Sequence, residues 1–283
     1  MSLLDTEIKA LRPDALAPAE IEAKAEAIGA GKANMPKGKA FVLAIMAGLF
    51  IGMGGMFMLL VKSDSSLGFA ASSLLGALVF CLGLFLVITA GAELFTGNCL
   101  MICGRLSSRY SWRKMLMSWV VVFIGNLVGS LIMVAILYFG NYWGMNGGAV
   151  GTAMMTVAAN KIDQAWGVLC LKGVMCNFLV CLAVWVSFAA RTITDKFFSV
   201  LLPITAFVAC GFEHCVANMF FLPMGLVMKL SGFAYAGAAN IDVISLGGVL
   251  YNISAATVGN IIGGVIFVGL TYWFAFARKK KSE

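Results

Sequence analysis

Long apolar stretches alternate with short polar segments along this chain. About 20 consecutive apolar residues are enough for a helix to cross the hydrocarbon core of a bilayer. The sequence offers six stretches of this kind, at Phe41–Val61, Phe69–Ala90, Met115–Phe139, Trp166–Ala190, Phe197–Met228 and Val249–Ala277. The pattern therefore predicts an all-α, polytopic membrane protein with six transmembrane helices.

Polar sequence flanks this membrane region at both ends. Pro18–Lys32 predicts a short helix with Ile21, Ala25 and Ile28 on one weakly apolar face. We expect it to lie against the cytosolic mouth of the protein; a gate or a docking site for a soluble partner is the alternative. The expected division is a cytosolic N-terminal segment, a six-span membrane domain and a basic cytosolic tail, at residues 1–36, 37–277 and 278–283.

The composition and the placement of charge support this topology. Hydrophobic residues make up 61% of the chain and charged residues 12%, whereas soluble domains carry about 25% charged residues. Of the 20 lysines and arginines, 16 fall in segments that a cytosolic N-terminus would place inside, and three in outer loops. The positive-inside rule then puts both termini in the cytosol. The net charge of +7 reflects the orientation of the chain in the membrane and does not indicate a nucleic-acid partner.

Two of the predicted spans are broken by polar residues at matching places. Glu93–Asn98 follows the second span, and Glu213–Asn218 interrupts the fifth at an offset of 120 residues. A second match, at an offset of 134, joins Gly125–Gly129 to Gly259–Gly263. Each half holds three spans, so the halves enter the membrane from opposite sides as an inverted 3+3 repeat. Broken helices at corresponding positions indicate where a transporter binds its substrate.

A broken helix leaves backbone N–H and C=O groups that lipid cannot satisfy. We expect the two carboxylates to accept hydrogen bonds from the exposed N–H groups, although a proton or ion ligand is the alternative. Gly91, Gly97 and Gly211 would permit the sharp turns. The residues assigned to the helix breaks and the adjoining interhelical contacts are Glu93, Gly97, Asn98, Asn126, Glu213, Asn218 and Asn260.

His214 is the only histidine of the chain, and Leu94 occupies its place in the other half. An imidazole exchanges protons at physiological pH, and an ionisable residue at membrane depth usually faces a pathway. We therefore predict a functional role for His214. Cys215 is expected to be a small packing residue, and Lys172 either snorkels outward or lends positive potential to the pathway.

The residues give little support for an enzyme or a metal centre. Eight cysteines lie in or beside apolar runs, where free cysteine packs as a small hydrophobe. Cys99 and Cys103 are one helical turn apart, but no second Cys/His pair completes a metal site. No His-Glu-x-x-His motif and no serine nucleophile motif accompanies His214. We expect no enzymatic activity, no metal and no cofactor.

Several segments resemble the formate/nitrite transporter family. They are Ala92–Asn98, Lys172–Asn177, Gly211–His214, Ala217–Met219 and Gly259–Gly264. The N-terminal helix and Leu270–Trp273 look closest to the formate-channel branch. The resemblance implies an aquaporin-like six-span protomer that assembles as a homopentamer, with one pore per protomer, in the inner cell membrane.

The resemblance also implies roles for individual residues. His214 matches the central pore histidine, Thr96 the residue that gates the cytoplasmic side, and Lys161 and Asn177 polar residues near the histidine. The cytoplasmic constriction would consist of Leu84, Leu94 and Val180, and the periplasmic constriction of Phe80 and Phe207. Cys215 departs mildly from the small residue, such as serine, that the family usually has there.

These observations predict a channel or transporter for small monovalent anions of weak acids. Formate is the first candidate, followed by nitrite, hydrosulfide, acetate or lactate. His214 would protonate the anion between two apolar constrictions, because a neutral acid crosses a low-dielectric slit at much lower cost than an anion. A channel for neutral solutes without proton coupling is the alternative from a different class. The sequence leaves open the physiological anion, the preferred direction and the gating pH.

Overall fold

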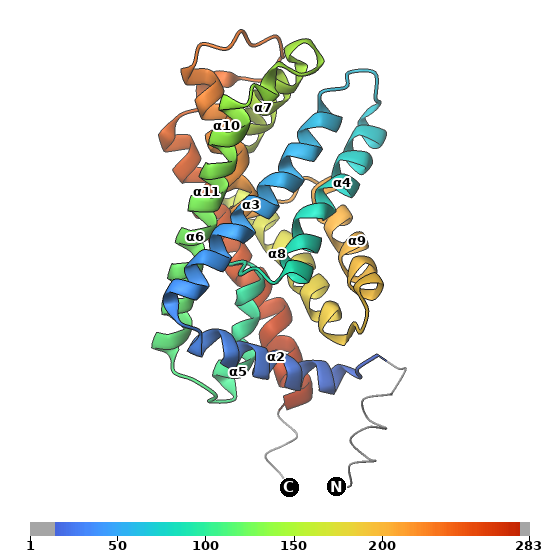
Figure 1. Ribbon diagram of the computed structural model, residues 1–283, viewed down its shortest axis with the longest axis vertical. Coiled ribbons are helices and arrows are strands. Elements are labelled where there is room, and N and C mark those ends of the chain that lie inside the picture. The colour runs from blue at the N-terminus through green and yellow to red at the C-terminus, as the bar shows by residue number, and fades with distance from the viewer. Residues whose placement is uncertain (1–14, 278–283) are drawn as a thin grey trace, which may run out of the picture.

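The computed structural model describes residues 15–277, which form a bundle of helices along one long axis (Figure 1). Within this range the chain holds helices and no strand. Five of the helices are long and apolar enough to cross a membrane. They are α3 (Lys37–Lys62), α4 (Phe69–Ala90), α6 (Trp112–Phe139), α8 (Trp166–Ala189) and α11 (Leu246–Ile262), the last of which continues in a wider helical coil to Ala277.

The predicted fifth span is divided into two shorter helices, α9 (Ile193–Ala209) and α10 (Cys215–Leu230). The chain after α4 also passes through an irregular segment and continues as a 3-10 turn, Gly97–Met101, and a short helix α5 (Ile102–Leu106). In Figure 1, α4 and α10 lie toward the upper end of the bundle, and α5 and α9 toward the lower end. The two broken elements therefore run in opposite directions. The sixth crossing remains a prediction, because neither α9 nor α10 is long enough alone.

The hydropathy pattern leaves Gly140 to Ala165, between the third and fourth predicted spans, as a loop, and this interpretation is wrong. The segment contains the 14-residue helix α7 (Ala149–Ile162). Its buried residues recur at helical spacing, as at Val150, Met154 and Ala158. Helix α7 lies at the end of the bundle opposite to α2 (Pro18–Asn34) (Figure 1). Each half of the repeat therefore begins with a short helix at its own end of the bundle.

Helix α2 lies across the lower end of the bundle (Figure 1). Ile21 and Ala25 are buried, and Ile28 lines a cavity there. The carboxylate of Glu26 accepts hydrogen bonds from Arg109 Nε at 3.0 Å and Nη2 at 2.8 Å, beyond the end of α5. These contacts attach α2 to the membrane domain through both its apolar and its charged side.

The last described segment of the chain lies at the same end as α2. Trp273 Nε1 donates to Ser107 Oγ at 2.8 Å, and Ser107 also donates to Glu26 on α2. Both described ends of the chain therefore meet at one end of the bundle. The basic tail at 278–283 and the first 14 residues of the predicted cytosolic segment lie outside the described residues.

Glycines let the helix backbones approach closely in both halves. A Cβ on Gly129 would lie 2.0 Å from the carbonyl oxygen of Ile45, where α6 crosses α3. A Cβ on Gly259 would lie 2.1 Å from the carbonyl oxygen of Cys170, where α11 crosses α8. Small residues at helix crossings supply the close packing that holds helices together in lipid. The repeated glycine–asparagine motifs thus mark the same crossing twice.

Candidate functional site

The two helix breaks begin with the same turn. Gly91 ends α4 with φ of 83°, and Gly211 follows α9 with φ of 69°. Both angles lie in the left-handed region that glycine adopts without steric cost. Gly97 differs from the expectation, because it begins a 3-10 turn and lies outside the glycines with positive φ. It lines a cavity instead, where a Cβ would meet the Val184 side chain at 3.6 Å.

Asn126 on α6 satisfies the backbone of the first break. Its Oδ1 accepts a hydrogen bond from the Phe95 N–H at 2.9 Å. Its Nδ2 donates to the carbonyl oxygens of Ala44 and Glu93, each at 2.8 Å. One buried side chain thereby pairs a free N–H and a free C=O of the break and ties both to α3.

Asn260 on α11 does the same for the second break. Its Oδ1 accepts from the Cys215 N–H at 2.9 Å, and its Nδ2 donates to the carbonyl oxygens of Gly173 and Glu213, each at 2.8 Å. Each atom of the Asn260 amide thus has the same kind of backbone partner as the matching atom of Asn126. An amide suits this task because it carries both a donor and an acceptor, whereas a carboxylate only accepts.

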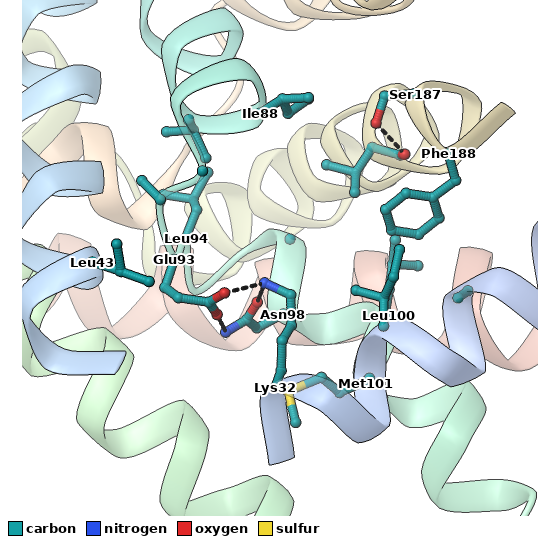
Figure 2. Close-up of a pocket in the computed structure, with 18 of the residues that line it drawn as sticks. Lys32, Leu43, Ile88, Glu93, Leu94, Asn98, Leu100, Met101, Ser187 and Phe188 are labelled. Carbon is teal, nitrogen blue, oxygen red and sulfur yellow. Dashed lines mark hydrogen bonds and ion pairs between the residues drawn. The ribbon is translucent and has the colours of Figure 1, made fainter. Parts of the chain in front are cut away.

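The Glu93 carboxylate has a different role from the one expected. It accepts from Lys32 Nζ at 2.7 Å and from Asn98 Nδ2 at 2.9 Å, and Lys32 Nζ also donates to Asn98 Oδ1 at 2.9 Å. Figure 2 shows the three side chains pointing toward one another beneath Leu94. The Glu93 side chain is 8% exposed and the Lys32 side chain 22%. Glu93 therefore pairs with a cation from α2, and the backbone N–H groups of the break find other partners.

Glu213 repeats this arrangement at the α7 end of the bundle. Its Oε1 lies 3.1 Å from Lys161 Nζ, and its Oε2 accepts from Asn218 Nδ2 at 2.6 Å and from Asn252 Nδ2 at 3.3 Å. Lys161 lies in the last turn of α7, as Lys32 lies in the last turn of α2. Each short helix thus inserts its final lysine into the break of its own half.

The sequence reasoning missed Lys32. The signal was present, because Lys32 and Lys161 are 129 residues apart, between the two repeat offsets of 120 and 134. Each lysine also precedes the broken motif of its half. Because the N-terminal segment is polar, the predicted repeat did not include it.

Thr96 and His214 join the two breaks at the centre of the molecule. Thr96 Oγ1 lies 2.9 Å from His214 Nε2, and both residues are buried. His214 also caps α10, because its Nδ1 accepts from the Ala217 N–H at 3.0 Å. An accepting Nδ1 carries no proton, so in the neutral ring Nε2 holds the hydrogen and donates it to Thr96.

A cavity enters the molecule from each end. The α2-side cavity has a volume of about 590 Å³, and Leu84, Leu94, Gly97 and Asn98 belong to its lining. The α7-side cavity has a volume of about 330 Å³, and Phe80, Phe207, His214 and Lys161 belong to its lining.

The apolar layer between the cavities is built on α4. Phe80 and Leu84 are four residues apart, one turn of the helix; each is 2% exposed, and each faces a different cavity. The Phe80 and Phe207 rings meet edge to face at 6.0 Å between centroids, and the Phe207 ring stacks on His214 at 5.9 Å. The imidazole therefore lies beside the aromatic pair, at the end of the α7-side cavity.

The remaining predicted site residues surround this centre. Asn177 is buried and donates to the carbonyl oxygens of Thr96 at 3.2 Å and Asn260 at 2.7 Å. It therefore connects the backbone of the first break to α11. Val180 is buried and lies outside the described lining of both cavities, whereas Val184, one turn further along α8, lines the α2-side cavity.

Two residues whose roles were left open also have definite places. Lys172 lines the α7-side cavity and donates to Gln164 Oε1 at 2.5 Å. The Cys215 side chain is buried. Among residues 15–277, no three histidine, cysteine, aspartate or glutamate side chains gather into a group that could hold a metal ion.

Comparisons with known proteins agree with this architecture. The sequence profile described as "Formate/nitrite transporter" matches residues 19–274. The formate channel FocA of Escherichia coli K12 is 35% identical over 276 residues, which cover 94% of this chain and 96% of the relative. The nitrite transporter NirC of Salmonella typhimurium is 35% identical over 268 residues, which cover 92% and 91%. A solved structure of a pentameric formate channel with formate bound superposes with a TM-score of 0.76 at 36% identity, covering 85% of this chain and 98% of that one.

Proposed function

The chain belongs to the formate/nitrite transporter family, a family of channels and transporters rather than enzymes, and on this premise we propose that it conducts small monovalent anions of weak acids across a membrane. Formate is the first candidate, and His214 is the proton donor. The observation that carries the proposal is the hydrogen bond between Thr96 and His214. It joins the two broken elements where the cavities from opposite ends approach each other.

Two costs bear on whether the solute crosses the apolar layer as an anion or as a neutral acid. A charged group at the bilayer centre costs at least about 2.5–3.5 kcal/mol, even on the most permissive scales. Charging the His214 ring requires a proton on Nδ1 and breaks the cap bond to Ala217; losing a helix cap costs about 0.5–2 kcal/mol. Protonating the solute removes the charge that would otherwise have to cross the apolar layer, and the cap bond is lost while the ring is charged.

Each proposed cycle passes one proton to the solute and restores the starting form of the imidazole. A proton from the α7-side cavity adds to Nδ1, and the ring becomes an imidazolium. The imidazolium transfers its Nε2 proton to a solute oxygen, so the solute becomes a neutral acid and the ring a neutral imidazole with its proton on Nδ1. A second proton from the α7-side cavity then adds to Nε2, while Nδ1 returns its own proton to that cavity and restores the cap. One proton is consumed for each solute molecule.

The proposed orientation places the α2 end in the cytosol. The basic residues of the chain are concentrated in segments that lie at or lead to this end, and both described ends of the chain meet there. The positive-inside rule assigns such an end to the cytosol. We therefore infer a multi-pass protein of the inner membrane with both termini cytoplasmic.

A homopentamer is the proposed assembly, because a structurally similar formate channel is pentameric. Large apolar side chains on the outside of the protomer, such as Phe139 at 83% exposure and Leu202 at 75%, need lipid or a neighbouring copy against them. Native mass spectrometry of the detergent-solubilised protein should give five times the mass of the chain. A stable monomer would contradict the proposal.

The identity of the solute calls for a direct test. Relatives named for formate and for nitrite are both 35% identical to this chain, so identity does not separate them. We propose stopped-flow uptake of formate, nitrite, hydrosulfide, acetate and glycerol into proteoliposomes over a range of pH, with protein-free vesicles subtracted. Formate uptake should be fastest and should increase as the external pH falls, while glycerol should not pass. Glycerol uptake with no anion uptake would instead identify a neutral-solute channel.

A further inference from the structure

Positive side chains gather around the α2-side cavity. Its lining includes the five basic residues Lys24, Lys32, Lys39, Arg191 and Lys196. They come from α2, from the start of α3 and from the region where α8 leads into α9. The described lining contains a single carboxylate, Glu93, which pairs with Lys32. With Lys32 paired to Glu93, the three lysines Lys24, Lys39 and Lys196 have no further carboxylate within the described lining.

Lys24 lies close enough to Lys196 and Arg191 for their positive charges to act on it. Lys24 Nζ donates to the carbonyl oxygen of Phe188 at 2.6 Å, an acceptor that carries no charge. Partial burial lowers the pKa of Lys24, and the charges of Lys196 and Arg191 lower it further. The side chains around the cavity are thus arranged at a local electrostatic cost.

The nearby acid does not offset this cost fully. Asp195 Oδ2 accepts from the backbone N–H groups of Arg191 at 3.0 Å and Thr192 at 2.9 Å, as part of the cap of α9. Its charge is therefore already used to stabilise the start of a helix. The positive-inside rule explains the sign of the charge at this end, but it does not require basic residues from three separate segments to share one cavity.

The size of the cavity also exceeds what the proposed solute needs. Its volume of about 590 Å³ falls in the range of about 300–1,000 Å³ typical of sites for drug-sized ligands. A three-atom carboxylate would fill little of it. A larger ligand with several negative oxygens would match both the volume and the excess charge.

We propose that the α2-side cavity binds a multivalent, phosphate-class anion through Lys24 and Lys196, and that the bound anion obstructs the mouth of the pore. This site goes beyond the transport function, because its ligand is not the transported solute. Charge-assisted hydrogen bonds from the two side chains hold the phosphate oxygens. The ligand bridges α2 to the region between α8 and α9 across the opening shown in Figure 2, where Phe188 and Lys32 border the cavity.

Binding can be measured without any transport assay. The full-length protein in nanodiscs of neutral phosphatidylcholine is titrated calorimetrically with inorganic tripolyphosphate at low and high salt. We expect binding that weakens with salt and that is at least about tenfold weaker in the Lys24→Gln/Lys196→Gln variant, since both charge-assisted hydrogen bonds to the anion are lost. The charge-matched control is Arg113→Gln/Lys114→Gln, at the start of α6 and outside the cavity lining. It should bind as the wild type does.

Two outcomes would overturn the site: no binding to the wild type at low salt, or equal weakening in the two double variants. Because calorimetry reports binding alone, the result is independent of whether the protein transports formate. Circular dichroism and gel filtration on the same samples establish that each variant is folded.

The source of the phosphate groups is distinguished in the same preparation. Adding phosphatidylglycerol to the nanodiscs supplies anionic phospholipid headgroups. If these occupy the site, tripolyphosphate should bind more weakly to the wild type by a larger factor than to the Lys24→Gln/Lys196→Gln variant. If both weaken equally, the site takes a soluble phosphorylated compound.

The obstruction of the pore is tested by flux. Saturating tripolyphosphate on the α2 side of oriented proteoliposomes should reduce formate uptake by the wild type several-fold, and should leave the Lys24→Gln/Lys196→Gln variant much less affected. Uptake by the wild type that is unchanged at saturation would overturn the proposed obstruction.

Discussion

Lys161 Nζ lies 3.1 Å from Glu213 Oε1, and at the other end of the bundle Lys32 makes the same contact with Glu93 at 2.7 Å. In both cases a lysine in the last turn of a short helix neutralises the carboxylate of a helix break. The pairing keeps an uncompensated negative charge away from the path of an anion. It also fixes α2 and α7 to the membrane domain.

Removing Lys32 should destabilise the protein. The Lys32→Met variant leaves the Glu93 carboxylate 8% exposed with Asn98 as its remaining partner. Breaking a fully buried pair costs about 3–5 kcal/mol; because Lys32 is 22% exposed, we expect roughly 1–3 kcal/mol. The unfolding free energy in mixed micelles measures the loss. The surface variant Lys114→Met is the control and should change it little.

The double variant Lys32→Met/Glu93→Gln separates the ion pair from the packing of the lysine stem. A neutral amide does not need the cation, so much of the lost stability should return. If the double variant is no more stable than Lys32→Met, the charge of Glu93 is not what Lys32 compensates.

Replacing Asn260 should be more damaging still. In Asn260→Leu, the Cys215 N–H and the Glu213 carbonyl oxygen lose the amide that binds them, and the Gly173 carbonyl oxygen in α8 loses one hydrogen bond. Each unsatisfied buried group costs about 1–3 kcal/mol, so the total is on the order of 3 kcal/mol or more. We expect little folded protein by gel filtration, and the same result for Asn126→Leu. The exposed control Asn34→Leu should fold normally, and a well-folded Asn260→Leu protein would refute the role assigned to this side chain.

The glycine crossings give a prediction about packing. Gly259→Ala places a methyl group 2.1 Å from a backbone oxygen of α8, so the helices must separate. We expect a loss of about 1–3 kcal/mol from overpacking, visible as a lower unfolding temperature. Gly167→Ala adds the same methyl group at the start of α8 with no atom within 4 Å, and it should be neutral or slightly stabilising. Equal stability of the two variants would contradict the close crossing.

The sequence predicted the long membrane helices and the two matching helix breaks. Apolar runs located the long helices to within a few residues, and the offset of 120 residues located both breaks. Helix α7 was missed because its small and polar residues resemble those of a loop in composition, although its buried positions follow helical spacing. Hydropathy alone does not distinguish a short helix that lines a cavity from a loop.

Contacts between distant segments were harder to predict. Lys32 and Glu93 are 61 residues apart and join a polar helix to a membrane segment. Neither the apolar runs nor the repeat offset predicts this pairing. The sequence also assigned the backbone of the breaks to the carboxylates, whereas Asn126 and Asn260 bind it. Only the folded geometry shows that an amide on a neighbouring helix reaches both a donor and an acceptor.

Thr96 should matter for transport through its hydroxyl group. The Thr96→Ala variant removes the partner of His214 Nε2 and leaves the cap bond to Ala217 as the remaining described hydrogen bond of the ring. We expect formate uptake to fall by roughly tenfold, since a net loss of about 1–1.5 kcal/mol in positioning corresponds to that factor. Thr96→Ser keeps the hydroxyl and should retain most of the activity. Equal uptake by the two variants would show that the hydroxyl does not position the imidazole.

The most direct test of the account follows protons and formate together in the His214→Asn variant. Asparagine is a good helix cap, so this variant retains an acceptor for the Ala217 N–H while it loses the titratable ring. Vesicles containing a pH-sensitive dye report proton entry while labelled formate reports uptake. The wild type should take up one proton per formate, and His214→Asn, folded and pentameric, should lose nearly all of this coupled uptake. Formate uptake and acidification that are undiminished in His214→Asn would contradict the proposal that His214 donates the proton.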